Sequence, residues 1–269
     1  MNRELKSRKP KAGLLLIASP RFKNLSGPQR GTYNDRKLKA VEDIKSSMDF
    51  LDLSYPGIIY EREDAEKAMK MFSDNEVDFI VAEFLSWSED FAWIRFLRDM
   101  PAVPMIFTNV VKDKMSFETT LDEDDFMDYL CSGTLVGSLE GSGSIRRIPR
   151  ANVKVVMGTR DEVTEKIRVF SKAALTRSVL RHSTVGLMAN MNEAMWSTYI
   201  DNYDLFTKIG PEIHYLPYSD YGEYIAKLSD AEVKEYADEL TSRYKACCFL
   251  SNDTLAMIGI FLWLTILYL

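Results

Sequence analysis

An arginine stands where an early buried strand is expected to end. The apolar run LLLIA occupies residues 14–18, and Ser19, Pro20, Arg21 and Phe22 follow it directly. Loops at the carboxyl ends of parallel strands are where open α/β folds bind ligands. The planar guanidinium of Arg21 would donate hydrogen bonds there to hydroxyl groups or to an anion. The alternative interpretation is an arginine that is solvated at the surface and binds nothing.

A tryptophan occupies a similar place after a later apolar run. Trp87 lies in the segment EFLSWSED of residues 83–90, which begins where the run at 78–84 ends. An indole face at this edge of a sheet can cover the apolar C–H face of a sugar. The alternative is a tryptophan that packs between the strand and the next helix. Arg21 and Trp87 are therefore the two candidate ligand-binding residues.

Two further groups favour structural roles. The glycine-rich run at residues 137–144 precedes Arg146 and Arg147 and could form an anion-binding nest. It has neither the P-loop ending nor the dinucleotide-binding spacing, so it predicts a flexible or interface loop. The acids at residues 122–125 are consecutive and point in different directions, which predicts a solvated helix start.

The only two histidines are His182 and His214. Neither lies in the sequence near a paired carboxylate or a cysteine cluster at ligand spacing, which favours structural roles for both. No Ser–His–Asp or Cys–His arrangement can be argued from the residue order. We therefore assign no catalytic residue and no metal ligand in this chain.

Apolar periodicity predicts the elements that would position Arg21 and Trp87. Strands that are apolar on both faces alternate with amphipathic helices, which is typical of a parallel sheet covered on both sides. The predicted fold class is α/β, with a doubly wound, mainly parallel (Rossmann-like) sheet in an N-terminal domain of residues 1–180. The predicted strands lie at 14–19, 57–60, 78–84, 103–108 and 153–158, and the helical patterns at Ala65, Ala68, Met69 and Phe72, at Phe91, Ile94 and Leu97, and at Val163, Ile167, Phe170 and Ala174.

A second α/β domain is predicted over residues 181–269. Its pattern starts with a strand at 184–190, followed by a helix at 195–208, a strand at 212–218 and helical segments up to 244. A doubly wound domain needs several more strands to close its core. We therefore expect this second domain to be truncated.

Composition excludes one class of partner and indicates a compartment. The formal charge of −6 argues against nucleic-acid binding, which requires a continuous basic surface. Cys131, Cys247 and Cys248 form neither a disulfide framework nor the spaced pairs of a zinc site, which favours a cytoplasmic location. The basic residues before the first apolar run superficially resemble a signal peptide, but the run is too short, and a first buried strand is favoured.

The last fifteen residues, 255–269, carry no charge. They are shorter than the roughly 20 residues that span a bilayer as a helix. The interpretations are a tail anchor that reaches a membrane, a fully buried helix, or an unnatural end of the coding sequence. If little structure encloses this segment, the chain should aggregate or partition into detergent, and truncation after Asp253 should improve its solubility.

Several segments, in this order, resemble one known family. They are Ser19-Pro20-Arg21, the loop with Trp87, the sequence LEGSG at 139–143, and the stretch Thr184–Leu240. Together they resemble the N-terminal part of the L-fucose/L-arabinose isomerase-like family over residues 12–246.

The resemblance implies a role in carbohydrate metabolism. Family members interconvert aldoses and ketoses with a divalent metal, typically Mn²⁺, held by two carboxylates and a histidine. Those ligands come from parts of the family that this sequence lacks, so the resemblance implies no cofactor held by this chain alone. It implies instead that Arg21 and Trp87, and less specifically Met195, contact a pentose or deoxyhexose in a homo-oligomer. The alternative to Met195 as a ligand contact is a core methionine.

Three functional hypotheses follow. The first is an N-terminal recognition and assembly portion of a sugar isomerase that is inactive by itself. The second is a stand-alone sugar-binding or regulatory α/β module, and the third is a tail-anchored membrane protein that uses residues 255–269.

Overall fold

The computed structural model describes residues 8–27, 31–111, 134–148, 150, 152–188, 194, 201–217, 222–223 and 226–243. Contacts divide the chain into two compact units, Lys9–Thr176 and the combination of Met1–Arg8 with Arg177–Leu269. We call them the sheet unit and the C-terminal unit. The division falls within helix α7 (Arg160–Arg181), and the boundary predicted near residue 180 lies in the same helix.

The sheet unit is built on a parallel β-sheet with the strand order β4-β1-β6-β7-β8. In the centre, β1 pairs with β6 in a register that runs from Ala12 opposite Phe79 to Ile17 opposite Phe84. The short strands β4 and β5 pair with the start and the end of β1, so they act as one interrupted strand. The strands are β1 (Lys11–Ile17), β4 (Asp52–Ser54), β5 (Ile58–Ile59), β6 (Phe79–Phe84), β7 (Met105–Val110) and β8 (Val153–Gly158).

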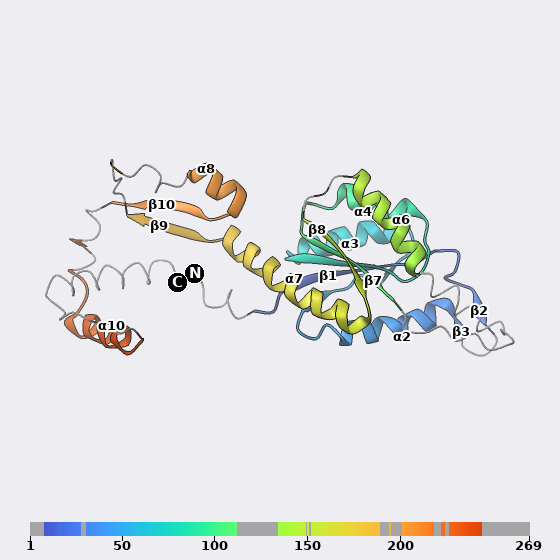
Figure 1. Ribbon diagram of the computed structural model, residues 1–269, viewed down its shortest axis with the longest axis horizontal. Helices are drawn as coiled ribbons and strands as arrows, with labels where there is room; N and C mark the ends of the chain where they lie inside the picture. The colour runs from blue at the N-terminus through green and yellow to red at the C-terminus, as the bar shows by residue number, and fades with distance from the viewer. Residues whose placement is uncertain are drawn as a thin grey trace. The chain divides into compact units, whose positions relative to one another are not determined.

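Helices cover both faces of this sheet. Helices α2 (Tyr33–Ser46) and α7 lie on one face, and α3 (Arg62–Asp74), α4 (Asp90–Asp99) and α6 (Thr134–Arg147) lie on the other (Figure 1). Two apolar clusters, one on each side of the strands, form the core. The predicted α/β class with a mainly parallel sheet is therefore confirmed.

Local sequence explains why these elements form. All six residues of β6 are buried, as expected for a strand covered on both faces. Helix α2 begins with a capping box, in which Thr32 and Asp35 satisfy each other's backbone N–H groups. A two-residue antiparallel pair, β2 (Ser26–Gly27) with β3 (Gly31–Thr32), precedes this helix. In α3, Ala65, Ala68 and Phe72 face the core at the predicted helical spacing.

The predicted face of α4 is wrong for two of its three residues. Phe91 and Ile94 are 62% and 38% exposed, whereas Trp93 and Phe96 are buried together with Leu97. The spacing of three between Phe91, Ile94 and Leu97 fits a helix, but the row Trp93, Phe96 and Leu97 buries more aromatic surface. Trp93 stacks on Phe96 with an interplanar angle of 5° and 6.4 Å between ring centroids.

The glycine-rich run is helical, which corrects the predicted loop. Residues 137–144 lie within α6 and pack against β6 and β7. A Cβ atom on Gly137 would overlap the carbonyl oxygen of Ser86, and one on Gly141 would lie 2.8 Å from the Phe84 ring. The glycines therefore allow a close approach of helix and sheet, which compensates for their low helix propensity. The acids at 122–125 lie outside the described residues.

The C-terminal unit contains a second parallel pair of strands. Strand β9 (Thr184–Met188) pairs with β10 (Glu212–Leu216), and the two lie within the strands predicted at 184–190 and 212–218. Between them lie the short helix α8 (Asn202–Asp204) and a π-helical turn, η2 (Leu205–Ile209). Helix α10 (Asp230–Arg243) follows. Met195 and the apolar segment 255–269 lie outside the described residues.

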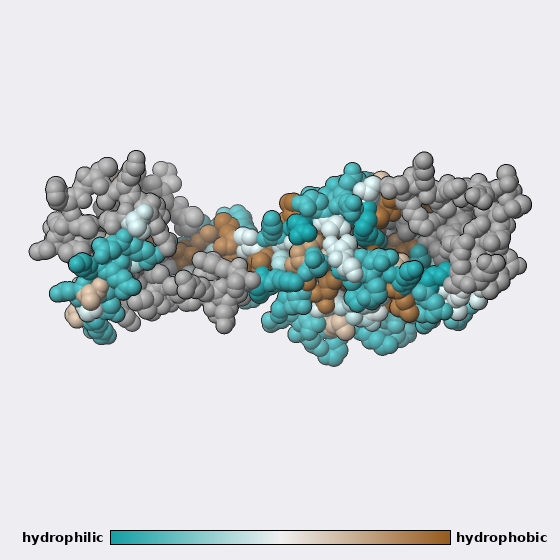
Figure 2. All heavy atoms as spheres, turned by 90° about the horizontal axis from the view of Figure 1, so that it is seen from below, coloured by the Kyte–Doolittle hydropathy of each residue, from teal (hydrophilic) through white to brown (hydrophobic). Residues whose placement is uncertain are grey.

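The surface of the sheet unit is mainly polar on one side. Figure 2 looks onto the side of α2 and α7, where hydrophilic residues predominate and apolar areas are small and separate. Val155 and Met157 on the edge strand β8 are each 54% exposed. Within the described part of the chain, no helix is both long enough and apolar enough to cross a membrane.

Candidate functional site

The strand order of the sheet unit reverses between β1 and β6. After β1 the chain adds β4 and β5 on one side, and it then crosses to place β6 on the other side. The loops that leave the carboxyl ends of β1 and β6 therefore run apart. In open α/β sheets, this reversal creates the crevice in which ligands bind. Arg21 follows β1 and Trp87 follows β6, so both lie at this edge.

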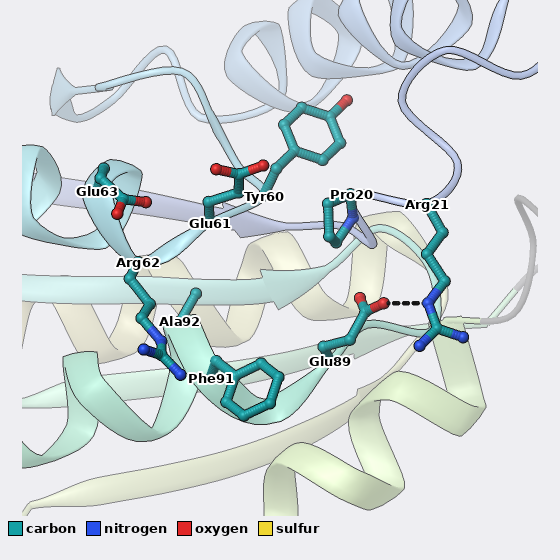
Figure 3. Close-up of a pocket in the computed structure, with 9 residues that line it drawn as sticks. All are labelled: Pro20, Arg21, Tyr60, Glu61, Arg62, Glu63, Glu89, Phe91 and Ala92. Atoms are coloured by element: carbon teal, nitrogen blue, oxygen red, sulfur yellow. Dashed lines mark ion pairs between the residues drawn. The ribbon is translucent and has the colours of Figure 1, made fainter.

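Arg21 is held by a carboxylate from the neighbouring loop. Its Nε lies 2.7 Å from Oε1 of Glu89, and the hydroxyl of Ser19 donates to Oε2 of Glu89 at 2.9 Å. Glu89 is the N-cap residue of α4, but its side chain makes these bonds instead of capping the helix. The Arg21 side chain remains 71% exposed, and the ion pair drawn in Figure 3 joins its Nε, and not a terminal nitrogen, to Glu89.

Trp87 lies beside Arg21. The guanidinium carbon of Arg21 is 5.6 Å from the centroid of the indole, within the range of a cation–π contact. The Phe22 ring contacts the indole with 6.2 Å between centroids, and the indole Nε1–H donates to Oε1 of Glu140 at 3.0 Å. The structure thus brings the two sequence-predicted residues together and adds three partners to them.

A hollow of about 380 Å³ opens next to Arg21. It lies between the loops after β1, β5 and β6 and combines aromatic surface with both signs of charge (Figure 3). On its rim, the guanidinium of Arg62 lies over the Phe91 ring at 4.8 Å. Trp87 does not line the hollow itself but contacts Arg21, which does. The lining residues are Pro20, Arg21, Tyr60, Glu61, Arg62, Glu63, Glu89, Phe91 and Ala92.

A buried ion pair lies farther along the same edge. Glu83 on β6 has a side chain that is 4% exposed, and it binds the guanidinium of Arg160 through two bonds of 2.6 and 3.0 Å. The hydroxyl of Thr108 on β7 donates to the same carboxylate at 2.9 Å. Both oxygens of Glu83 are therefore satisfied, and the arrangement fastens the start of α7 to the sheet.

The remaining sequence candidates belong to the C-terminal unit or lie outside the described residues. Met195 lies outside the described residues. His182 belongs to the C-terminal unit, where its Nδ1 lies 2.8 Å from the carbonyl oxygen of Ser178. His214 is on β10 and is exposed. Among the residues described, no three His, Cys, Asp or Glu side chains come close enough together to hold a metal ion.

Sequence reasoning missed Ser19, Glu89 and Glu140. Ser19 lies two residues before Arg21, and Glu89 lies two residues after Trp87. Their closeness in the sequence to the two candidates could have predicted them. Glu140 is 53 residues from Trp87, and its position depends on the close packing of α6 on the sheet. No local pattern marks such a residue.

Comparison with known proteins adds no assignment. No known protein family matches this chain, and no curated protein matches it at a significant level. The resemblance to the isomerase-like family therefore remains a hypothesis based on the motifs quoted above.

Proposed function

We propose that the carboxyl edge of the sheet unit binds a pentose or deoxyhexose, and that the chain is the N-terminal recognition and assembly portion of an aldose–ketose isomerase-like protein. The observation that carries the sugar-binding part is the contact of Arg21 with Trp87, with Glu89 fixing the arginine, at the point where the strand order reverses. Ligands of open α/β sheets bind at such a point.

The chemistry of these groups suits a polyhydroxylated ligand. The terminal nitrogens of Arg21 are donors for hydroxyl oxygens, and the carboxylates of Glu61, Glu63 and Glu89 are acceptors for hydroxyl hydrogens. Phe91 and Tyr60 offer apolar ring surface for C–H groups. The hollow, at about 380 Å³, is within the size range of small-molecule sites. Donors, acceptors and aromatic surface together favour a neutral sugar over an anion.

The isomerase part of the proposal rests on the resemblance alone. In that family a divalent metal, typically Mn²⁺, polarises the oxygens at C1 and C2 of the sugar. The resemblance assigns the ligands of that metal to other parts of the family, so the proposal gives this chain no chemical step. Its proposed contribution is recognition of the sugar and contact between subunits of a cytoplasmic homo-oligomer.

Calorimetric titration of the purified chain tests the sugar-binding part. L-Fucose and L-arabinose should release or absorb measurable heat in the millimolar range, and the variant Arg21→Ala should bind neither sugar measurably there. Arg98→Ala is the matched control, because Arg98 is also exposed but pairs with Asp99 away from this edge. Absence of binding by the unmodified chain at high millimolar sugar would overturn the proposal.

A separate assay tests the recognition-only role. The chain incubated with either sugar and Mn²⁺ should form no ketose. Turnover above that of buffer would show that the chain itself performs the isomerisation.

A further inference from the structure

Trp87 is bonded at its polar end to a residue that no part of the proposed function uses. The indole has one hydrogen-bond donor, and it is directed to Oε1 of Glu140 at 3.0 Å. Phe22 contacts the same ring at 6.2 Å and Arg21 lies over it at 5.6 Å. The bond to Glu140 is the directional one of these contacts. It therefore restricts the rotation of the indole most strongly.

Glu140 is carried by a helix that is closely seated on the sheet. Gly137 and Gly141, on the same helix, allow α6 to approach the backbone of Ser86 and the rings of Phe84 and Phe107. The indole Nε1–H of Trp93 donates to the carbonyl oxygen of Gly141 at 3.0 Å, and this hydrogen bond is buried. Gly141 directly follows Glu140 in the sequence. This bond and the glycine contacts fix the backbone that carries Glu140.

We infer that Glu140 is a positioning residue for Trp87. Its carboxylate orients the indole so that one face lies under the guanidinium of Arg21. The inference rests on the proposed function, because the arranged pair is the proposed sugar contact. A carboxylate acceptor also increases electron density in the indole, which strengthens the attraction of its face for a cation. Glu89, Arg21, Trp87 and Glu140 thus form one continuous series of contacts with a carboxylate at each end.

The hydrogen bond between Trp87 and Glu140 is exposed to solvent, so an effect of Glu140 on the orientation of Trp87 can be measured apart from an effect on stability. Glu140 lies at the surface, and a hydrogen bond in such a place contributes little to the free energy of unfolding. Loss of the carboxylate should therefore leave the fold intact and change only the orientation of Trp87. A glutamine at the same position keeps an oxygen that accepts the indole hydrogen, whereas an alanine does not.

The test compares Glu140→Ala, Glu140→Gln and the control Glu165→Ala, a substitution of an exposed glutamate on α7. In ¹H–¹⁵N spectra of the full chain, Glu140→Ala should move the Trp87 indole N–H and the Arg21 Nε–H resonances, the latter through the changed ring current. It should also weaken L-arabinose binding about three- to fivefold, the equivalent of one modest hydrogen bond. Glu140→Gln should restore most of both effects, and Glu165→Ala should change neither.

The two readouts separate failure of the inference from failure of the proposed function. An unchanged Arg21 resonance in Glu140→Ala would overturn the positioning role, whether or not sugar binds. Unchanged sugar affinity in a variant whose resonances do move would overturn it as well. If the unmodified chain binds no sugar, the proposed function fails, and the spectra alone decide whether Glu140 positions Trp87.

Discussion

The guanidinium carbon of Arg21 lies 5.6 Å from the ring centroid of Trp87, although the two are 66 positions apart in the sequence. Each residue follows one of two adjacent parallel strands, β1 and β6, and the register of these strands brings their carboxyl ends level. The contact is therefore a consequence of strand order. It holds a cation, an aromatic face and the Glu89 carboxylate at one edge of the sheet.

Substitution of Arg21 by lysine should weaken sugar binding by roughly tenfold, as expected when hydrogen bonds to a charged group are lost. A lysine keeps the charge, but its single ammonium cannot bond to Glu89 and present a planar pair of donors to a ligand at once. Calorimetry measures the effect, with Arg98→Lys as the control. Equal affinity in Arg21→Lys and the unmodified chain would show that only the charge matters.

The glycines of α6 provide a stability test with a built-in control. Gly137→Ala should lower the free energy of unfolding by about 1–3 kcal/mol, because the added methyl group collides with Ser86 and Phe84. Gly143→Ala has no atom within 4 Å of the new methyl group and should stabilise the helix by roughly 0.5–1 kcal/mol. Urea unfolding measures both, and a stabilising Gly137→Ala would contradict the close packing of α6.

These glycines also show where sequence patterns mislead. The run at 137–144 was predicted to be a loop, but it is helical because contact with Phe84 and Phe107 outweighs the low helix propensity of glycine. The strands were predictable, since nearly all residues of β1 and β6 are apolar on both faces. Their carboxyl ends located Arg21 and Trp87. Glu140 could not be predicted, because its contact with Trp87 depends on how α6 is seated.

The face of α4 was mispredicted for a related reason. Phe91 and Ile94 fit a helical repeat as well as Trp93 and Phe96 do, so periodicity alone does not choose between the two rows. Packing on the sheet decides which row is buried, because Trp93 contacts both Phe84 and Phe107. Phe91 remains exposed and lines the hollow beside Arg21.

The ion pair of Arg160 with Glu83 should contribute far more to stability than that of Arg98 with Asp99. Both have a shortest distance of 2.6 Å, but the Glu83 side chain is 4% exposed whereas those of Arg98 and Asp99 are 64% and 33% exposed. Arg160→Ala leaves a buried carboxylate without its cation and should cost about 3 kcal/mol. Arg98→Ala should cost less than about 0.5 kcal/mol. Similar losses measured by urea unfolding would contradict the assigned burial.

Tyr55 should make stability depend on pH in the alkaline range. Burial, with a smaller contribution from the nearby charge of Glu42, raises the pKa of Tyr55 to about 12 from 10.0. The unfolded chain then loses this proton at lower pH than the folded chain, so the contribution of Tyr55 is complete below pH 10 and declines as the pH rises towards 12. Tyr55→Phe should remove this part of the decline in unfolding free energy. An identical pH profile in the variant would contradict it.

The most direct test of sugar recognition follows side-chain resonances of the ¹⁵N-labelled chain during titration with L-arabinose and L-fucose. The Arg21 Nε–H and Trp87 indole N–H signals should shift together with one dissociation constant. The indole signal of Trp93, whose N–H is bonded to Gly141 in the core, should stay in place. If the Arg21 and Trp87 signals do not move at saturating sugar, or if only residues away from this edge respond, the proposed site is wrong.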